Sequence, residues 1–304
     1  MPEQALGQLF AIATALLWAC SAVCFEAAGR RVGSLVVNLL RLSIAAVLLG
    51  GLCYLRRGLV WPGDASGHTW AWLLVSGGLG FFVCDLCLFR AYVLIGARRS
   101  TLVLALAPVF AAVLDAFVLR RSPTLLQGVG MAVTLIGVVW VIAERPNDEA
   151  VHTARERRIG IVLALVAAVM QPLGAASAAV GMTLPGGGQF DPMAATFIRV
   201  LAGVAGFVVL VPLSGRTRDV IAGVRDARAM TLLGLGALAG PVLGVTLFLA
   251  SLQRLPSGVT QTILATIPVL LLPVAMFQKH ERVTWRAAAG AMVAVGGVVI
   301  LCLT

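Results

Sequence analysis

Asp85 is the residue with the clearest potential for chemistry, because it lies near the middle of a long apolar segment between Trp70 and Leu94. Ionisable side chains in such segments are costly, so they tend to face a protein interior and to mark the path of a ligand or ion. An unpaired carboxylate there could bind a proton or attract the ammonium group of a substrate. The alternative is a structural carboxylate paired with an arginine of another helix. The sequence leaves both interpretations open.

Glu26 and Arg41 form a second candidate pair, on either side of a predicted loop. Glu26 precedes this loop by about one helical turn and Arg41 follows it by about two, so on antiparallel neighbours they reach similar depths. An ion pair between them is the favoured interpretation. A gate at one mouth of a pathway is the alternative.

Pro108 and Pro268 each remove a helix hydrogen bond near the centre of an apolar segment. In a membrane such breaks persist where neighbouring groups or a cavity satisfy the freed carbonyl. We expect kinks that line a pathway, with simple tolerated kinks as the alternative. Aromatic and hydrogen-bonding side chains that could add walls to a substrate cavity are Trp18, Ser21, Tyr92, Gln171, Thr260 and Gln261.

The cysteine and histidine residues do not suggest a metal site. The cysteines all fall in apolar segments, where a free thiol usually acts as a small buried hydrophobe. Cys84 and Cys87 have CxxC spacing, but a zinc or redox site would want a second pair or polar partners. The histidines are expected in loops at His68, His152 and His280. No metal or other cofactor is therefore predicted.

The sequence also lacks the motifs of an enzyme. It has no HExxH motif, no Ser–His–Asp grouping that could share a site, and no Gly-Lys-Ser phosphate-binding loop. We therefore expect no catalytic residues, and without a nucleotide site the energy for any transport must come from a gradient.

The composition places these residues in a membrane. The chain of 304 residues is 60% hydrophobic and only 12% charged, whereas a soluble domain carries roughly 25% charged residues. No Asp, Glu, Lys or Arg occurs from Ile159 to Phe190, and such a stretch is long enough to cross a bilayer. The net charge of +10 comes from basic residues that punctuate loops, so the lipid bilayer, and not nucleic acid, is the expected partner. The first apolar segment lacks the basic start of a signal peptide and is expected to be a retained helix.

Apolar runs between charged or Gly/Pro punctuation predict ten transmembrane helices. Their approximate ranges are 7–28, 34–55, 70–94, 100–119, 124–143, 159–183, 193–213, 230–253, 257–277 and 285–303. A hydrophilic stretch near the midpoint separates a first five-helix unit, 1–145, from a second, 159–304, through a linker at 146–158. A polar loop at 216–228 could contain an amphipathic turn.

The two units resemble each other in sequence. A shift of 160 residues places Pro108 on Pro268, a shift of 159 places Phe89 on Phe248, and a shift of 158 places Arg41 on Arg199. Five helices is an odd number, so the second unit must enter the membrane from the opposite side. The prediction is therefore an all-α membrane protein of two inverted repeats, with a substrate site near the midplane and alternating access.

Arg199 has no counterpart of Glu26, since Ala179 occupies that position in the second unit. Because arginine recurs in both units without that glutamate, packing or snorkelling is favoured for it over chemistry.

With these segments in place, the chain resembles the EamA-type transporters of the drug/metabolite transporter superfamily. The resemblance rests on the order of short motifs in both units: Leu17-Trp18-Ala-Cys-Ser21, Arg41-Leu-Ser-Ile-Ala-Ala, Phe89-Arg-Ala-Tyr92, Pro108-Val-Phe, Ile267-Pro268-Val269, Glu281-Arg282-Val-Thr and Gly290. The first unit departs from the pattern, with Arg120-Arg121-Ser where Glu-Arg would stand, and Gln171 stands where a second tryptophan is expected. The resemblance implies ten helices, export or exchange of small metabolites such as amino acids, and no enzymatic activity.

The favoured function is therefore a secondary transporter in the cell inner membrane, monomeric or oligomeric, that carries a small molecule and could couple to protons. The alternatives are a membrane-embedded enzyme acting on lipids and a non-transporting membrane scaffold. Loop charges favour both termini outside, whereas the resemblance implies that both are cytoplasmic. The sequence leaves orientation, direction and substrate open.

Overall fold

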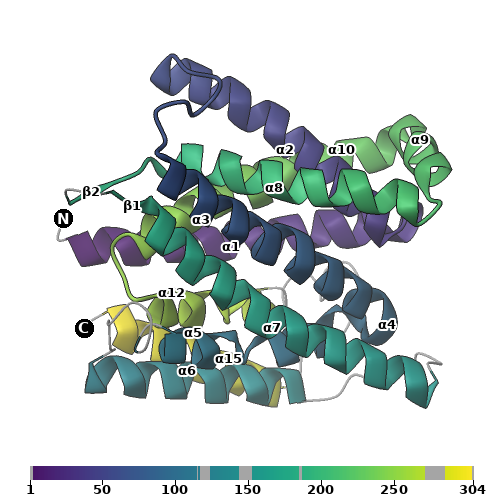
Figure 1. Ribbon diagram of the computed structural model, residues 1–304. Helices are drawn as coiled ribbons and strands as arrows, with labels where there is room; N and C mark the ends of the chain where they lie inside the picture. The colour runs from purple at the N-terminus through teal and green to yellow at the C-terminus, as the bar shows by residue number, and fades with distance from the viewer. Residues whose placement is uncertain are drawn as a thin grey trace.

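The computed structural model describes residues 3–114, 116, 124–143, 153–184, 187–270 and 285–302, which are almost entirely helical (Figure 1). Six helices in this part of the chain are long and apolar enough to cross a membrane. They are Glu3–Val32, Ser34–Arg57, Gly67–Ile95, Ala154–Met182, Pro192–Leu213 and Ala227–Leu252, and shorter apolar helices lie at Leu125–Gly137 and Ala288–Ile300.

The elements of the first half follow one another with short connections. They are α1 (Glu3–Val32), α2 (Ser34–Arg57), α3 (Gly67–Gly77), the π-helical segment η1 (Gly78–Cys84), α4 (Asp85–Leu104), α5 (Ala107–Leu114) and α6 (Leu125–Ala143). Helix α3, η1 and α4 run on as one long continuous helix, because each passes directly into the next.

The second half repeats this order and adds a small hairpin and a short helix. Its elements are α7 (Ala154–Met182), β1 (Thr183–Leu184), β2 (Gly188–Gln189), α8 (Pro192–Leu213), α9 (Thr217–Arg225), α10 (Ala227–Ala237), η3 (Leu238–Gly244), α11 (Val245–Leu252), α12 (Ser257–Leu264), α13 (Ile267–Leu270) and α15 (Trp285–Cys302). The strands β1 and β2 are antiparallel. Helix α9 lies in the loop where an amphipathic turn was expected.

The two halves repeat at the level of individual elements. Helix α3, η1 and the start of α4 recur 160 residues later as α10, η3 and the start of α11, so Asp85 corresponds to Val245. This replaces the predicted shift of 159 for the third helix. Even the caps match, since the N–H of Thr69 donates to Ser66 Oγ at 3.1 Å and the N–H of Ala229 donates to Asp226 Oδ1 at 2.9 Å.

The predicted spans 100–119 and 257–277 are each interrupted at the same place. Turns at 105–106 and 265–266 separate α4 from α5 and α12 from α13. Pro108 and Pro268 then stand in the first turn of the next helix, where a missing N–H costs nothing. The kinks expected at these prolines are thus full helix breaks. Of the remainder of both spans, residues 115, 117–119 and 271–277 lie outside the described residues.

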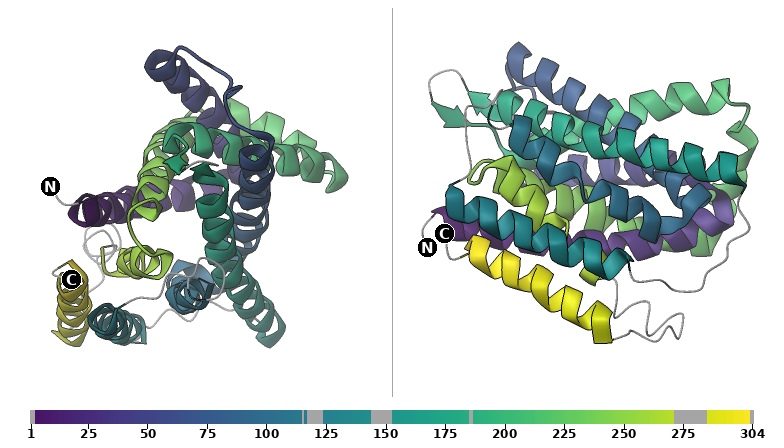
Figure 2. Two further views of the ribbon diagram at one scale, coloured as in Figure 1. Left: turned by 60° about the vertical axis from the view of Figure 1, so that its left-hand side comes forward. Right: turned by 90° about the horizontal axis from the view of Figure 1, so that it is seen from below.

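The last helices of the two halves, α6 and α15, pack side by side at one edge of the molecule (Figure 2). Glycine permits this close approach. A Cβ atom at Gly137 would lie 2.3 Å from the backbone nitrogen of Ala294, and one at Gly297 would lie 2.4 Å from that of Thr134. Close backbone contact through small residues is a common way for helices to associate in lipid.

Corresponding helices of the two halves run in opposite directions. Helix α2 runs away from the end that carries α9, whereas α8 runs toward it, and the N- and C-termini lie at the same end (Figure 1). An ion pair between the halves lies at each end of the molecule. Glu3 Oε2 is 2.9 Å from Arg254 Nε at the end with the termini, and Arg31 Nη2 is 2.8 Å from Asp226 Oδ2 at the opposite end.

Candidate functional site

The charged group at the centre of the first half is the Arg41–Asp85 ion pair. Helix α2 carries Arg41, which is 4% exposed, and Arg41 Nη2 donates to Asp85 Oδ2 at the start of α4. Arg41 Nε donates to Asn38 Oδ1 at 3.0 Å. The rings of Phe25 and Phe89 lie 5.2 and 4.8 Å from the guanidinium carbon. Of the two interpretations that the sequence left open for Asp85, the structure shows the carboxylate paired with an arginine of another helix.

The ion pair predicted between Glu26 and Arg41 is corrected. Glu26 Oε1 accepts a hydrogen bond from Arg30 Nη2 at 2.6 Å, one turn along the same helix. Glu26 lies close to the end of α1, with its side chain 40% exposed, whereas Arg41 is buried against α4. The two side chains thus have different partners, Arg30 for Glu26 and Asp85 for Arg41.

Arg199, the repeat mate of Arg41, is buried on α8 and is 5% exposed. Its guanidinium carbon lies 5.2 Å from the centre of the Phe81 ring, which belongs to η1 of the other half. Snorkelling therefore does not describe either arginine, because both head groups are inside the protein. The packing expected for Arg199 is present through Phe81.

Gln171 and Gln261 meet within the second half, where Gln171 Nε2 donates to Gln261 Oε1 at 3.0 Å. Gln261 is 2% exposed, and its Nε2 has no hydrogen-bond partner within the described structure. The same holds for the hydroxyl of Ser257, one turn earlier on α12. The neighbouring hydroxyl of Thr260 is paired with that of Ser251 at 3.1 Å.

Trp18 and Ser21 lie where α1 of the first half packs on η3 and α11 of the second. The ring centroids of Trp18 and Phe248 are 5.5 Å apart. A Cβ atom at Gly244 would lie 2.6 Å from the Trp18 ring, and one at Gly240 would lie 3.1 Å from Ser21 Oγ. The predicted wall residues Trp18 and Ser21 thus contact the opposite half across glycines.

The remaining predicted residues are more scattered. The Tyr92 ring lies 5.7 Å from that of Phe89, so it adjoins the surroundings of Arg41. Pro108 is buried on α5, and the side chain of Pro268 lies outside the described residues. The structure thus brings together Asp85 with Arg41 and Gln171 with Gln261, but it does not gather all the predicted residues around one cavity.

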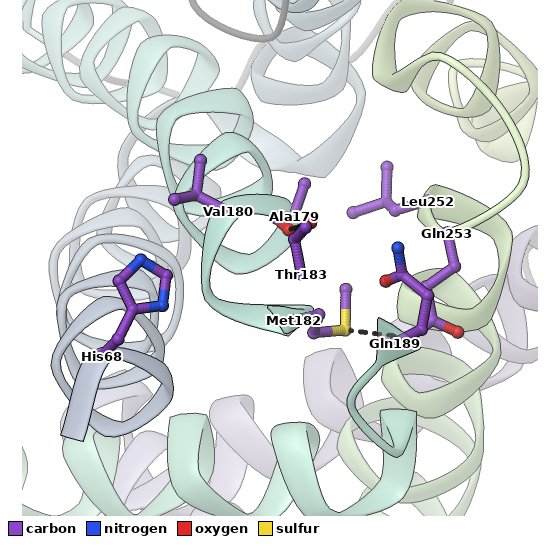
Figure 3. A pocket seen from close by; sticks show the side chains of 8 residues that line it. All are labelled: His68, Ala179, Val180, Met182, Thr183, Gln189, Leu252 and Gln253. Atoms are coloured by element: carbon purple, nitrogen blue, oxygen red, sulfur yellow. Dashed lines mark hydrogen bonds between the residues drawn. The ribbon is translucent and has the colours of Figure 1, made fainter. Parts of the chain in front are cut away.

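A pocket of about 410 Å³ opens at the end of the molecule that carries the termini (Figure 3). It lies between the start of α3 in the first half and the ends of α7 and α11 in the second, and is lined by His68, Ala179, Val180, Met182, Thr183, Gln189, Leu252 and Gln253. Gln253 Nε2 closes one wall by donating to the Phe190 carbonyl at 2.8 Å.

Sequence reasoning did not identify this pocket. His68, which was expected in a loop, lies in the first turn of α3, and His152 and His280 lie outside the described residues. The only local signal was a polar residue, Gln253, at the end of an apolar run. Within the described ranges, no three His, Cys, Asp or Glu side chains gather as a metal ion requires.

These features define a class: a multi-pass helical membrane protein of two repeats, with a buried ion pair, buried amides and a pocket between the halves. The sequence model of the EamA-like transporter family matches residues 5–143 and again residues 158–303. The chain therefore belongs to the EamA-like transporter family, consistent with the drug/metabolite transporter superfamily.

Comparison with solved structures supports the fold. A solved structure described as "Crystal structure of protein" is 18% identical in sequence, with a TM-score of 0.74, and the alignment covers 99% of this chain and 98% of that chain. At this identity the likeness concerns the fold alone. Among curated proteins, none matches the chain.

Proposed function

We propose that this protein is a secondary, gradient-driven transporter of the cell inner membrane that exports or exchanges small metabolites such as amino acids. In this proposal ten transmembrane helices form two inverted five-helix repeats, 1–145 and 159–304, joined by the linker 146–158. The substrate binds between the halves, and rocking of one half against the other opens the site to each side in turn.

The observation that carries the proposal is the repetition of α3–η1–α4 as α10–η3–α11 in the opposite direction. Two halves with the same α–π–α order but opposite directions can exchange conformations, and that exchange moves an opening from one face to the other. The two interruptions before Pro108 and Pro268 fit this mechanism, because helix breaks allow local bending.

The difference between the two ends of the molecule also supports the proposed alternating access. The pocket lies between the halves at the end with the termini. At the opposite end, Arg31 and Asp226 join α1 to α10. In the proposed cycle this pair opens when the pocket closes. Exposed ion pairs contribute only about 0–1 kcal/mol, so such a contact can break in each cycle.

The test is uptake into proteoliposomes, with a panel of labelled metabolites and with or without an imposed proton gradient. We expect uptake of at least one class of metabolite above protein-free liposomes. Preloading with unlabelled substrate should accelerate uptake, because a carrier exchanges. Folded, reconstituted protein that moves no member of the panel would contradict the proposal.

A further inference from the structure

The repeat-related arginines Arg41 and Arg199 differ in their polar partners. Arg41 is held by Asn38 and Asp85. The shifts of 158 and 160 residues that relate these helices place Thr196 where Asn38 would be and Val245 where Asp85 would be. The second half has therefore kept the buried guanidinium but lost both groups that hold it in the first half.

Thr196 does not compensate for this loss. Its hydroxyl donates to the Pro192 carbonyl at 2.8 Å and accepts a hydrogen bond from Thr246 at 3.3 Å. Val245 is apolar and buried. The Nε and Nη1 atoms of Arg199 are fully buried and have no hydrogen-bond partner in the described part of the chain.

The guanidinium of Arg199 points toward the other half. Its carbon lies against the Phe81 ring, and a Cβ atom at Gly80 would lie 3.0 Å from Nη2. Gly80 in turn adjoins Gly174 of α7, where a Cβ atom would be 3.2 Å from the Gly80 nitrogen. Glycines at both positions keep side chains away from the head group at the boundary between the halves.

Gln171 lies three residues before Gly174 and so faces the same side of α7. It is bonded to Gln261, whose Nε2 is a second buried donor without a partner. One cation and one amide donor thus lie near the same boundary with hydrogen-bonding capacity unused. Buried hydrogen-bond donors without an acceptor are unfavourable, so a ligand that supplies an anionic acceptor would be stabilised there.

We propose that Arg199 binds the carboxylate of the transported metabolite. This inference rests on the proposed transport function and names its substrate class: a small molecule with a carboxylate group. A guanidinium recognises a carboxylate through two parallel hydrogen bonds, and Nε with one terminal nitrogen offers that geometry. Asp85 of the first half acts electrostatically on Arg199, but its carboxylate is hydrogen-bonded to Arg41 and leaves Nε and Nη1 of Arg199 without an acceptor.

The experiment compares three mixtures in proteoliposomes: the proteinogenic L-amino acids, short 2-hydroxy acids, and the carboxamides of the same amino acids. The first two share the carboxylate and differ in the ammonium group, and the third lacks the carboxylate. We expect uptake of at least one carboxylate mixture to exceed carboxamide uptake by about 10-fold or more, the effect of one charge-assisted hydrogen bond.

Two variants test the residue itself. Arg199→Gln should lower carboxylate uptake by about 10-fold to 100-fold and leave carboxamide uptake unchanged. Val245→Asp should have the same effect for another reason, because it restores the missing carboxylate inside the protein and competes with the substrate. Arg216→Gln, an equal change of charge in an exposed loop, is the control and should behave as wild type.

Thermal unfolding with each mixture separates failure of this inference from failure of the transport proposal. A carboxylate-specific rise in Tm for wild type that Val245→Asp abolishes supports the site, even if nothing is transported. Equal effects of acids and carboxamides, or folded variants that keep wild-type carboxylate uptake, would overturn the site while transport stands. If neither uptake nor a shift in Tm is seen, both proposals fail.

Discussion

At the scale of single residues, the central feature is that Asp85 is not a free carboxylate but forms a buried ion pair with Arg41. Removing one member of such a pair leaves a charge buried without a partner, whereas replacing both members by apolar residues is often neutral. An unpaired carboxylate at Asp85 could be replaced by asparagine without loss of a structural partner, whereas the pairing with Arg41 makes Asp85 part of the structure.

We predict that Asp85→Asn lowers the free energy of unfolding by roughly 3–5 kcal/mol, because Arg41 loses its counter-charge. The double variant Arg41→Met with Asp85→Leu should be clearly more stable than Asp85→Asn. Chemical denaturation in detergent measures both. An Asp85→Asn protein as stable as wild type would show that the pair does not support the fold.

Asp85 could be singled out from the sequence because a carboxylate in a long apolar run is rare. Its partner could not, because the choice between Arg41 and Arg199 depends on how far each helix is rotated about its axis. The same limitation led to the incorrect Glu26–Arg41 pair. The structure was needed to show that Val245 occupies the position that corresponds to Asp85, so that the second half supplies no carboxylate for Arg199.

At the scale of elements, the corresponding helices α3 and α10 begin with N-caps at equivalent positions. Ser66 caps α3 and Asp226 caps α10. The pKa of Asp226 lies below its usual value because the N–H of Ala229 donates to its carboxylate and Arg31 pairs with it. A lowered folded-state pKa means that the stabilisation is fully present above the unfolded pKa, roughly 3.9, and is lost as pH falls through the folded pKa.

We predict that Asp226→Asn keeps the cap but removes this acid dependence, because the amide oxygen accepts the same hydrogen bond without a charge. Ser66→Ala should cost about 1 kcal/mol at every pH, since the cap that it removes does not ionise. Thermal unfolding between pH 3 and pH 7 (roughly the range around that pKa) measures both. The same pH profile in wild type and Asp226→Asn would exclude the assigned contribution.

The contact between α6 and α15 provides a further prediction. Gly137→Ala should destabilise the protein, because its Cβ would meet the Ala294 backbone nitrogen at 2.3 Å and the helices would have to separate. Gly296→Ala is the matched control, since nothing lies within 4 Å of its Cβ position. It should be neutral or stabilising by about 0.5–1 kcal/mol, as alanine favours helix. Equal Tm values for the two variants would argue against tight packing at Gly137.

The sequence located most of the long helices, because charge and Gly/Pro punctuation mark where an apolar run meets water. It did not locate the π-helical segments η1 and η3 or the turns before the two prolines. These features lie inside uninterrupted apolar runs, where the hydrophobic pattern is insensitive to a local change of helix type. The structure shows that η1 and η3, and likewise the two turns, are each separated by 160 residues.

At the scale of the whole molecule, the two halves run in opposite directions and are joined at both ends by ion pairs. The odd number of predicted spans in each unit was sufficient to expect this inversion. The pocket at one end could not be expected, because it depends on how the ends of α3, α7 and α11 meet. Alternating access requires the halves to move relative to each other during transport.

The most direct test of this motion is a reversible cross-link between the halves. Cysteines replace Arg31 and Asp226 in a protein without its native cysteines, and a reductant-cleavable bifunctional thiol reagent joins them. The control places cysteines at Arg216 and Asp219, an ion pair within one half. We predict that linking 31 to 226 stops uptake, that reduction restores it, and that the control link has no effect. Uptake at the unlinked rate while the halves remain joined would contradict alternating access.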